Sequence, residues 1–221
     1  MTTILLARHG ESDWNRDRRW QGHADRPLTD LGREQARALA DRLATTELDA
    51  VYSSDLERAR ETAAIVAELH CLPVRELSDL REVDVGSWSG LSRAEAEELF
   101  PDAFRRWTAG GEGWDDGETY EQLSGRVLGA VLEIAARHPE ERILLVAHGG
   151  SIRAVHAAAL GVDVHTYRRA QRVEPNATLS AVSVEDSGLT ELSRDEDLDK
   201  FLVADQQRRR AAAARPPTPA G

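Results

Sequence analysis

The sequence has little cysteine, little lysine and no long hydrophobic run. Cys71 is its one cysteine, which excludes an internal disulfide. The first residues, MTTILLARHG, lack the basic and long apolar regions of a secretion signal. The longest apolar run, Ile143 to Ala147, is far shorter than the roughly 20 residues that cross a bilayer. We therefore expect a soluble, cytoplasmic protein with no membrane contact.

The charge is acidic overall and basic in one place. With 28 Lys and Arg against 39 Asp and Glu, the net charge of −11 argues against a nucleic-acid partner, which requires a basic face. Lys200 is the one lysine, so the basic residues are nearly all arginine. Several lie near the N-terminus: Arg8, Arg16, Arg18, Arg19 and Arg26. Arginine matches the geometry of phosphate and carboxylate, which favours a small anionic substrate; a solvated charged loop is the alternative.

The order of apolar segments predicts an α/β fold. Buried strands are expected over Thr3 to Ala7, Asp49 to Ser53 and Ile143 to Ala147, each followed by a helical pattern. These helices are expected over 30–44, 55–69 and 149–160, with another over 118–137. Such alternation predicts a three-layer α/β/α sandwich with a mainly parallel sheet. A terminal hairpin is expected over 177–192, around Asp186-Ser187-Gly188.

One domain over residues 1–207 fits this length, because such a chain buries a core without disulfides or metals. Residues 208–221, rich in Arg, Ala and Pro, are expected to be a disordered tail. Within the domain, about 91–119 is less regular and holds several aromatic residues. It predicts either a small cap over a site or a surface excursion with its own apolar cluster.

Two histidines follow predicted strands. His9 comes directly after the first strand and His148 directly after the strand that ends at Ala147. Ligands of open parallel sheets bind beyond the carboxyl ends of the strands, so both histidines are expected at one rim. Arg58 lies in the first turn of the helix after the second strand, and Gly149 and Gly150 begin a helix whose free N–H groups favour an anion. The convergence predicts a phosphate site.

The same residues allow two chemical interpretations. A metal site of His9, His148 and Glu82 is one, but Arg8 and Arg58 would repel a cation and the chain has no HExxH or CxxC element. The other is phosphoryl transfer to a neutral imidazole, His9, with arginines stabilising the transferring oxygens. The leaving oxygen then needs a carboxylic acid, and Glu82 is the candidate. Sequence reasoning alone does not choose it among 39 acidic residues.

Arg8-His9-Gly10 resembles the signature of the histidine phosphatase, or phosphoglycerate mutase-like, superfamily. Further matching elements occur in family order and cover about residues 3 to 185. They are Asn15, Pro27-Leu28-Thr29 with Gly32, Ser53-Ser54-Asp55-Leu56 with Arg58-Ala59, Leu80 and Glu82 with Gly86 and Gly90, and His148-Gly149. The resemblance implies an enzyme with His9 as the phosphorylated nucleophile and Glu82 as proton donor and acceptor. It implies a phosphate pocket of Arg8, Arg58 and His148, and no metal.

The resemblance also implies substrate contacts. Asn15 and Gly149 resemble further phosphate contacts, and Gln21 with Gly22 matches a substrate-contacting loop. Arg93 falls where cofactor-dependent mutases carry a lysine, and Arg105-Arg106 resembles their substrate-binding arginine pair. These positions favour a phosphoglycerate-like or sugar phosphate ligand.

Within this family the sequence favours a phosphatase over a mutase. The chain lacks the Pro-rich insertion that such mutases carry after the arginine pair, and it reads His-Gly-Gly where they read His-Gly-Asn. A mutase must shield phosphohistidine from water, so a short cap favours hydrolysis. The alternative is a mutase that depends on 2,3-bisphosphoglycerate, and another is a non-catalytic module that binds a phosphoester. The resemblance is also compatible with a homodimer, although no stripe of residues in the sequence indicates a dimer interface.

Overall fold

The computed structural model describes residues 1–186, 188–195 and 197–213. Its strands are β1 (Thr2–Arg8), β2 (Ala50–Ser54), β3 (Val74–Leu77), β4 (Arg142–Ala147), β5 (Leu179–Glu185) and β6 (Gly188–Ser193). Its α-helices are α1 (Asp13–Arg16), α2 (Asp30–Leu43), α3 (Glu57–Leu69), α4 (Arg93–Leu99), α5 (Pro101–Thr108), α6 (Tyr120–Arg137), α7 (Gly149–Ala159), α8 (Val164–Ala170) and α9 (Leu198–Ala213). Two short 3₁₀ turns, Ser78–Leu80 and Gly86–Trp88, follow β3.

The strands form one sheet in the order β3-β2-β4-β1-β5-β6. The pairs β3–β2, β2–β4 and β4–β1 are parallel, whereas β5 and β6 pair antiparallel at one edge. The mainly parallel sheet and the terminal hairpin are therefore confirmed, although β3 was not predicted. β3 is a short edge strand whose two end residues are half-buried and whose two middle residues are exposed, so it shows neither a continuous apolar run nor a clean alternation.

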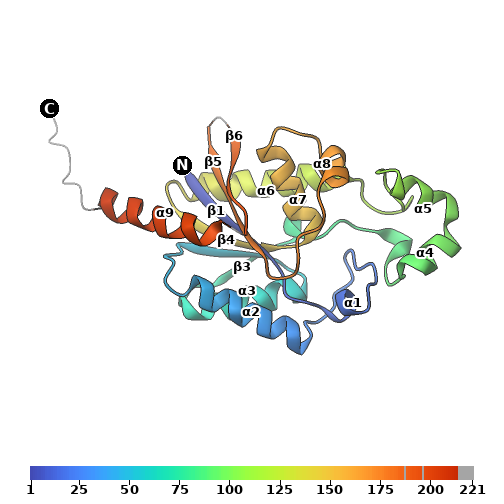
Figure 1. The fold of residues 1–221 in the computed structure, drawn as a ribbon, viewed down its shortest axis with the longest axis horizontal. Coiled ribbons are helices and arrows are strands. Elements are labelled where there is room, and N and C mark those ends of the chain that lie inside the picture. Colours follow the sequence, from blue (N-terminus) through green and yellow to red (C-terminus); the bar gives the residue numbers. More distant parts are fainter. Residues whose placement is uncertain (187, 196, 214–221) are drawn as a thin grey trace.

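Alternate residues of β1 point to opposite faces of the sheet and supply two hydrophobic cores. Ile4 and Leu6 pack with residues of α6 and α7, whereas Leu5 and Ala7 pack with residues of α2, α3 and α9. Figure 1 shows the sheet nearly edge-on between these two groups of helices. The predicted α/β/α sandwich is confirmed.

The end of the chain differs from the sequence-based expectation. Disorder was predicted from Arg208, but α9 continues through this point to Ala213; residues 214–221 lie outside the described part. Asp205 is buried on this helix and forms an ion pair with Arg142, whose side chain is fully buried at the start of β4. This contact joins residues far apart in the sequence, so composition could not reveal it.

Residues 91–119 form α4, α5 and a loop that returns to α6. Figure 1 shows these two helices projecting from one end of the molecule. Phe104 and Trp114 are buried and join the core cluster that contains Trp88, so the segment has no separate apolar cluster. Trp107 packs against the same cluster. The aromatic residues therefore fasten this segment to the main core.

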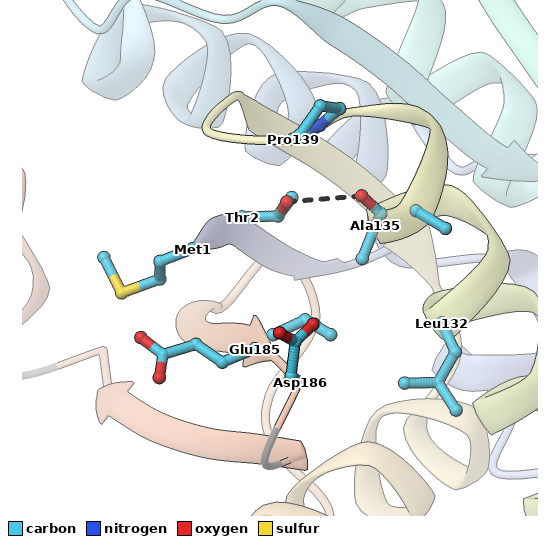
Figure 2. A pocket seen from close by; sticks show the side chains of 9 residues that line it. Met1, Thr2, Leu132, Ala135, Pro139, Glu185 and Asp186 are labelled. Atoms are coloured by element: carbon cyan, nitrogen blue, oxygen red, sulfur yellow. Dashed lines mark hydrogen bonds between the residues drawn. The ribbon is translucent and has the colours of Figure 1, made fainter.

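A cavity of about 690 Å³, larger than the one at the histidines, lies at the amino-terminal end of β1. Figure 2 shows Met1, Leu132 and the carboxylates of Glu185 and Asp186 around it. Among the described residues, neither histidine nor arginine lines it. His9 is at the other end of β1, roughly 20 Å away for a seven-residue strand. Size alone therefore does not locate the chemistry.

Within the described residues, no helix has the length and apolar character needed to cross a bilayer.

Candidate active site

The register of β1 against β4 places His9 beside His148. Arg8 pairs with Ala147 in this register, so the residues that follow them emerge next to each other at the carboxyl end of the strands. The centroids of the two imidazole rings lie 5.1 Å apart, with 59° between the ring planes. A cavity of about 170 Å³ opens here, lined by His9, Arg8, Arg58 and Glu82 among others.

The hydrogen bond of His9 fixes its tautomer. Nδ1 lies 2.6 Å from the carbonyl oxygen of Gly10, and a carbonyl can only accept, so Nδ1 carries the proton and Nε2 keeps its lone pair. Burial, followed by the charges of Arg58 and Arg8, holds the pKa of His9 well below its usual 6.5. The imidazole is thus neutral, which is the state that a nucleophile requires.

Arg58 and Arg8 supply positive charge at this cavity. Arg58 is 1% exposed, and its two Nη groups donate to the carbonyl oxygens of Ala24 at 2.8 Å and Gly22 at 2.9 Å. Arg8 donates through Nη1 to the carbonyl oxygen of Glu174. In both arginines the buried Nε–H has no partner among the described residues. Burial lowers the pKa of Arg58 to about 10, which leaves it charged at neutral pH, and burial also lowers the pKa of Arg8.

His148 is fully buried at the start of α7. Neither Nδ1 nor Nε2 has a partner among the described residues, which is unusual for a buried imidazole. Burial, with Arg58 as the next cause, holds the pKa of His148 well below 6.5. A phosphate oxygen beside His9 would satisfy one of these nitrogens.

Glu82 is held at the rim of the cavity through both its side chain and its backbone. Its two carboxylate oxygens accept from the backbone N–H of Gly150 at 3.0 and 3.1 Å, and one also accepts from the N–H of Val83 at 2.9 Å. Its carbonyl oxygen accepts from His23 at 2.9 Å and from Arg126 at 2.8 Å. The carboxyl group is therefore held at the cavity that His9 also lines.

Close backbone approach explains the glycines near His9. A Cβ on Gly10 would lie 2.3 Å from the carbonyl oxygen of Gly32, and a Cβ on Gly32 would lie 2.1 Å from that of Glu11. The N–H of Gly10 donates to the hydroxyl of Thr62 at 3.0 Å, and this hydroxyl donates to the carbonyl of Arg58 at 2.7 Å. The loop of His9 is thereby tied to the helix that carries Arg58.

A model of the histidine phosphatase superfamily (branch 1) matches residues 4–197. This chain belongs to that superfamily. It is 37% identical over 169 residues to "Phosphoserine phosphatase 1" of Hydrogenobacter thermophilus, covering 76% of this chain and 80% of the relative. It is 40% identical over 161 residues to "Metal-independent phosphoserine phosphatase" of Arabidopsis thaliana, covering 71% and 68%. Among solved structures, the mycobacterial glucosyl-3-phosphoglycerate phosphatase in complex with VO3 superimposes with a TM-score of 0.79 at 32% identity, covering 86% of this chain and 96% of that one.

Several predicted substrate contacts of this histidine phosphatase line the cavity: Asn15, Gln21, Gly22 and Gly149. The Ser12 hydroxyl links Asn15 and Gln21, because it lies 3.0 Å from Oδ1 of Asn15 and 2.8 Å from Oε1 of Gln21. Gly22 has a φ of +51°, and a Cβ there would meet the backbone of Val85 at 2.9 Å. Their assignment to substrate stays a prediction.

Three other predicted contacts do not reach the cavity of this histidine phosphatase. Arg105 and Arg106 are exposed on α5, where they pair with Asp102 and Asp115. Phe104 takes the buried side of this short helix, which leaves both arginines facing outward. The structure thus does not place this pair at the site. Arg93 stacks on Phe104 and Trp107, 5.2 Å from each ring, and lines a neighbouring cavity.

Three further residues at the site were not singled out from the sequence. Arg153 lies four residues after Gly149 on α7, a spacing that puts both on one helix face and could have signalled it. Tyr120, the first residue of α6, also lines the cavity, and burial raises its pKa to about 12. The amide of Asn176 donates to the carbonyl of His9 at 3.0 Å, because antiparallel β5 begins where β1 ends.

The segment 91–119 supplies no lining residue of the catalytic cavity among the described residues. It lies beside this cavity and walls the neighbouring one. The described residues contain one close set of possible metal ligands, Glu112, Glu121 and His165, and none of them lines the catalytic cavity.

Proposed function

We propose that this histidine phosphatase hydrolyses a small phosphomonoester through a phosphohistidine at His9. The observation that carries the proposal is the 2.6 Å contact between His9 Nδ1 and the carbonyl oxygen of Gly10, which leaves Nε2 unprotonated beside the buried Arg58 and the half-buried Arg8. The phosphorylated substrates named for the relatives, phosphoserine and glucosyl-3-phosphoglycerate, support a small phosphomonoester. The metal-independent relative supports chemistry carried by the side chains alone.

In the first step Nε2 of His9 attacks phosphorus in line with the leaving oxygen. The N–P bond forms as the P–O bond to the leaving group breaks, and Glu82 in its acid form gives its proton to the leaving oxygen. The guanidinium groups of Arg8 and Arg58 stabilise the charge that spreads over the transferring oxygens. His148 donates a hydrogen bond from one of its buried ring nitrogens to the same oxygens.

In the second step Glu82, now a carboxylate, takes a proton from water. The water oxygen attacks phosphorus, the N–P bond breaks, and inorganic phosphate leaves with His9 restored. The segment 91–119 supplies no lining residue of the catalytic cavity, which favours access of water to the phosphohistidine and so supports hydrolysis over transfer back to the product.

The test is incubation with 3-phosphoglycerate, with and without 2,3-bisphosphoglycerate, while free phosphate and 2-phosphoglycerate are followed together. Phosphate released without isomer, or release only from other phosphoesters of a panel, supports the proposal. Isomer formed in preference to phosphate and stimulated by the bisphosphate would identify a mutase. Tight phosphate binding without turnover of any phosphoester, and without labelling of His9, would identify a binding module.

A further inference from the structure

A second cavity of about 560 Å³ adjoins the catalytic one. The two share Arg153 and Val173 as lining residues, so they are neighbours along one surface. The second cavity has α4 and α5 on one side and α7 and α8 on the other. Figure 1 shows the projecting pair α4 and α5 at the end of the molecule nearest to α8. A substrate whose phosphoryl group reaches His9 would extend the rest of its body in this direction.

Arginines from three separate helices converge on this second cavity. Its charged lining residues are Arg93 of α4, Arg153 of α7, and Arg168 and Arg169 of α8. No aspartate or glutamate lines it among the described residues. Nor does any described carboxylate form an ion pair with these four arginines, whereas the nearby Arg105 and Arg106 are both paired. The fold therefore gathers positive charge here without a direct ion pair among the described residues.

Arg153 and Arg168 are the half-buried members of this group. Arg153 donates through Nη2 to the carbonyl of Gln171 at 2.7 Å, and Arg168 through Nη1 to that of Gly110 at 3.1 Å. The Nε–H of each is buried and has no partner among the described residues. Burial lowers the pKa of both guanidinium groups, a penalty that an anionic ligand would offset.

Arg168 is also coupled to the catalytic cavity. Its guanidinium carbon lies 3.4 Å from the centroid of the Tyr120 ring, and Tyr120 lines the catalytic cavity. This stacking orients the planar guanidinium group, which suits two-point capture of a carboxylate or phosphate. The pair thus spans the boundary between the two cavities.

We propose that Arg153 and Arg168 form a distal subsite that binds a second anionic group of the substrate, a carboxylate or a second phosphate. The inference rests on the proposed function, because it assumes that the first phosphate is the one presented to His9. The substrate class is then a phosphomonoester with two separated anionic groups.

The first test compares matched substrates with wild-type protein. One pair is 3-phosphoglycerate and glycerol 3-phosphate, which differ by a carboxylate; the other is fructose 1,6-bisphosphate and fructose 6-phosphate, which differ by a phosphate. We expect kcat/KM to favour the more anionic member of at least one pair by roughly ten- to hundredfold, the range of a charge-assisted hydrogen bond. The pair that responds identifies the anion. No preference in either pair would overturn the inference.

The second test repeats these ratios with Arg168→Gln, Arg153→Gln and Arg168→Lys. We expect each glutamine variant to reduce the preference about tenfold or more, and the lysine variant to restore part of it. The control is Arg137→Gln, an exposed arginine at the other end of α6, which should leave the ratios unchanged. Ratios equal to the wild-type ratios in folded Arg153→Gln and Arg168→Gln would also overturn the inference.

A binding measurement separates this inference from the proposed function. Calorimetric titration of the His9→Ala protein with the same pairs needs no turnover. If wild-type protein hydrolyses p-nitrophenyl phosphate but neither pair is distinguished in rate or in binding, the distal subsite is wrong and the phosphatase stands. If no phosphoester is hydrolysed yet the more anionic ligand binds more tightly, the subsite stands and the phosphatase is wrong.

Discussion

The backbone N–H of Gly150 donates to both carboxylate oxygens of Glu82, at 3.0 and 3.1 Å. A Cβ built on Gly150 would lie 2.1 Å from the nearer of these oxygens. The first turn of α7 therefore determines where the acid of the proposed reaction sits, although the two residues are far apart in the sequence.

Gly150→Ala should displace the Glu82 carboxyl group without removing it. We expect kcat for an alkyl phosphate to fall by about 10- to 100-fold, the scale on which general acid catalysis contributes. The loss for p-nitrophenyl phosphate should be much smaller. Gly129→Ala on α6 is the matched control, since nothing lies within 4 Å of its added Cβ. Equal loss on both substrates would argue against a positioning role for Gly150.

Glu82→Gln should show the same pattern more strongly. Glutamine keeps the size of the side chain and cannot give up a proton, so esters with poor leaving groups should slow by about 10²-fold or more. p-Nitrophenyl phosphate needs little protonation of its leaving oxygen and should slow less. The control is Glu133→Gln, an exposed residue of α6. The role assigned to Glu82 would be wrong if both kinds of ester slowed equally.

His9→Ala should abolish turnover, with kcat for p-nitrophenyl phosphate lower by at least about 10³-fold, because the nucleophile is lost. Wild-type protein quenched during turnover of a ³²P-labelled substrate should carry acid-labile label, and the variant should carry none. His70→Ala, at the end of α3, is the matched control. Activity retained by His9→Ala in a preparation free of contaminating phosphatase would exclude this mechanism.

His156 should make the protein less stable as the pH falls. Burial, followed by the charge of Arg194, lowers its folded pKa to about 4 from 6.5. Above pH 6.5 the imidazole is neutral in both states and contributes nothing. Between pH 6.5 and 4 the unfolded chain binds a proton that the folded chain does not, so the free energy of unfolding should fall by up to about 1.4 kcal/mol per pH unit.

Urea unfolding of the wild type and of His156→Gln at pH 7, 6 and 5 measures this contribution. The stability of the wild type relative to the variant should decline below pH 6.5, because the variant lacks the titrating group. Subtracting the free energy of unfolding of the variant from that of the wild type removes, to first order, the contribution of the other titrating groups. A difference that stays constant from pH 7 to 5 would contradict the prediction.

Arg105→Gln and Arg106→Gln should change kcat/KM by less than about threefold. Both arginines are exposed and paired on α5, and neither lines the catalytic cavity. Exposed pairs contribute about 0 to 1 kcal/mol, so stability should hardly change either. Steady-state kinetics on 3-phosphoglycerate is the check. A loss above tenfold would restore the substrate contact expected from the sequence.

Much of the rim of the site could be predicted because strand ends are local features. Apolar runs identified β1, β2 and β4, and the residues just after them had to emerge at one edge of a parallel sheet. The proximity of His9 and His148 followed from this argument, and the β1–β4 register confirms it. The choice of Glu82 could not be made in the same way, because its position depends on contacts with His23, Arg126 and Gly150.

The sequence by itself determined the fold class, the family and the side chains that gather at the strand ends, because these depend on periodicity and on motif order. Only the tertiary structure decided which arginines face the catalytic cavity and the cavity that adjoins it. Arg105 and Arg106 point outward since Phe104 takes the buried side of α5, whereas Arg153 and Arg168 come from different helices and meet at one wall. The direction of a side chain depends on which face of its helix is buried, and packing between distant segments sets that face.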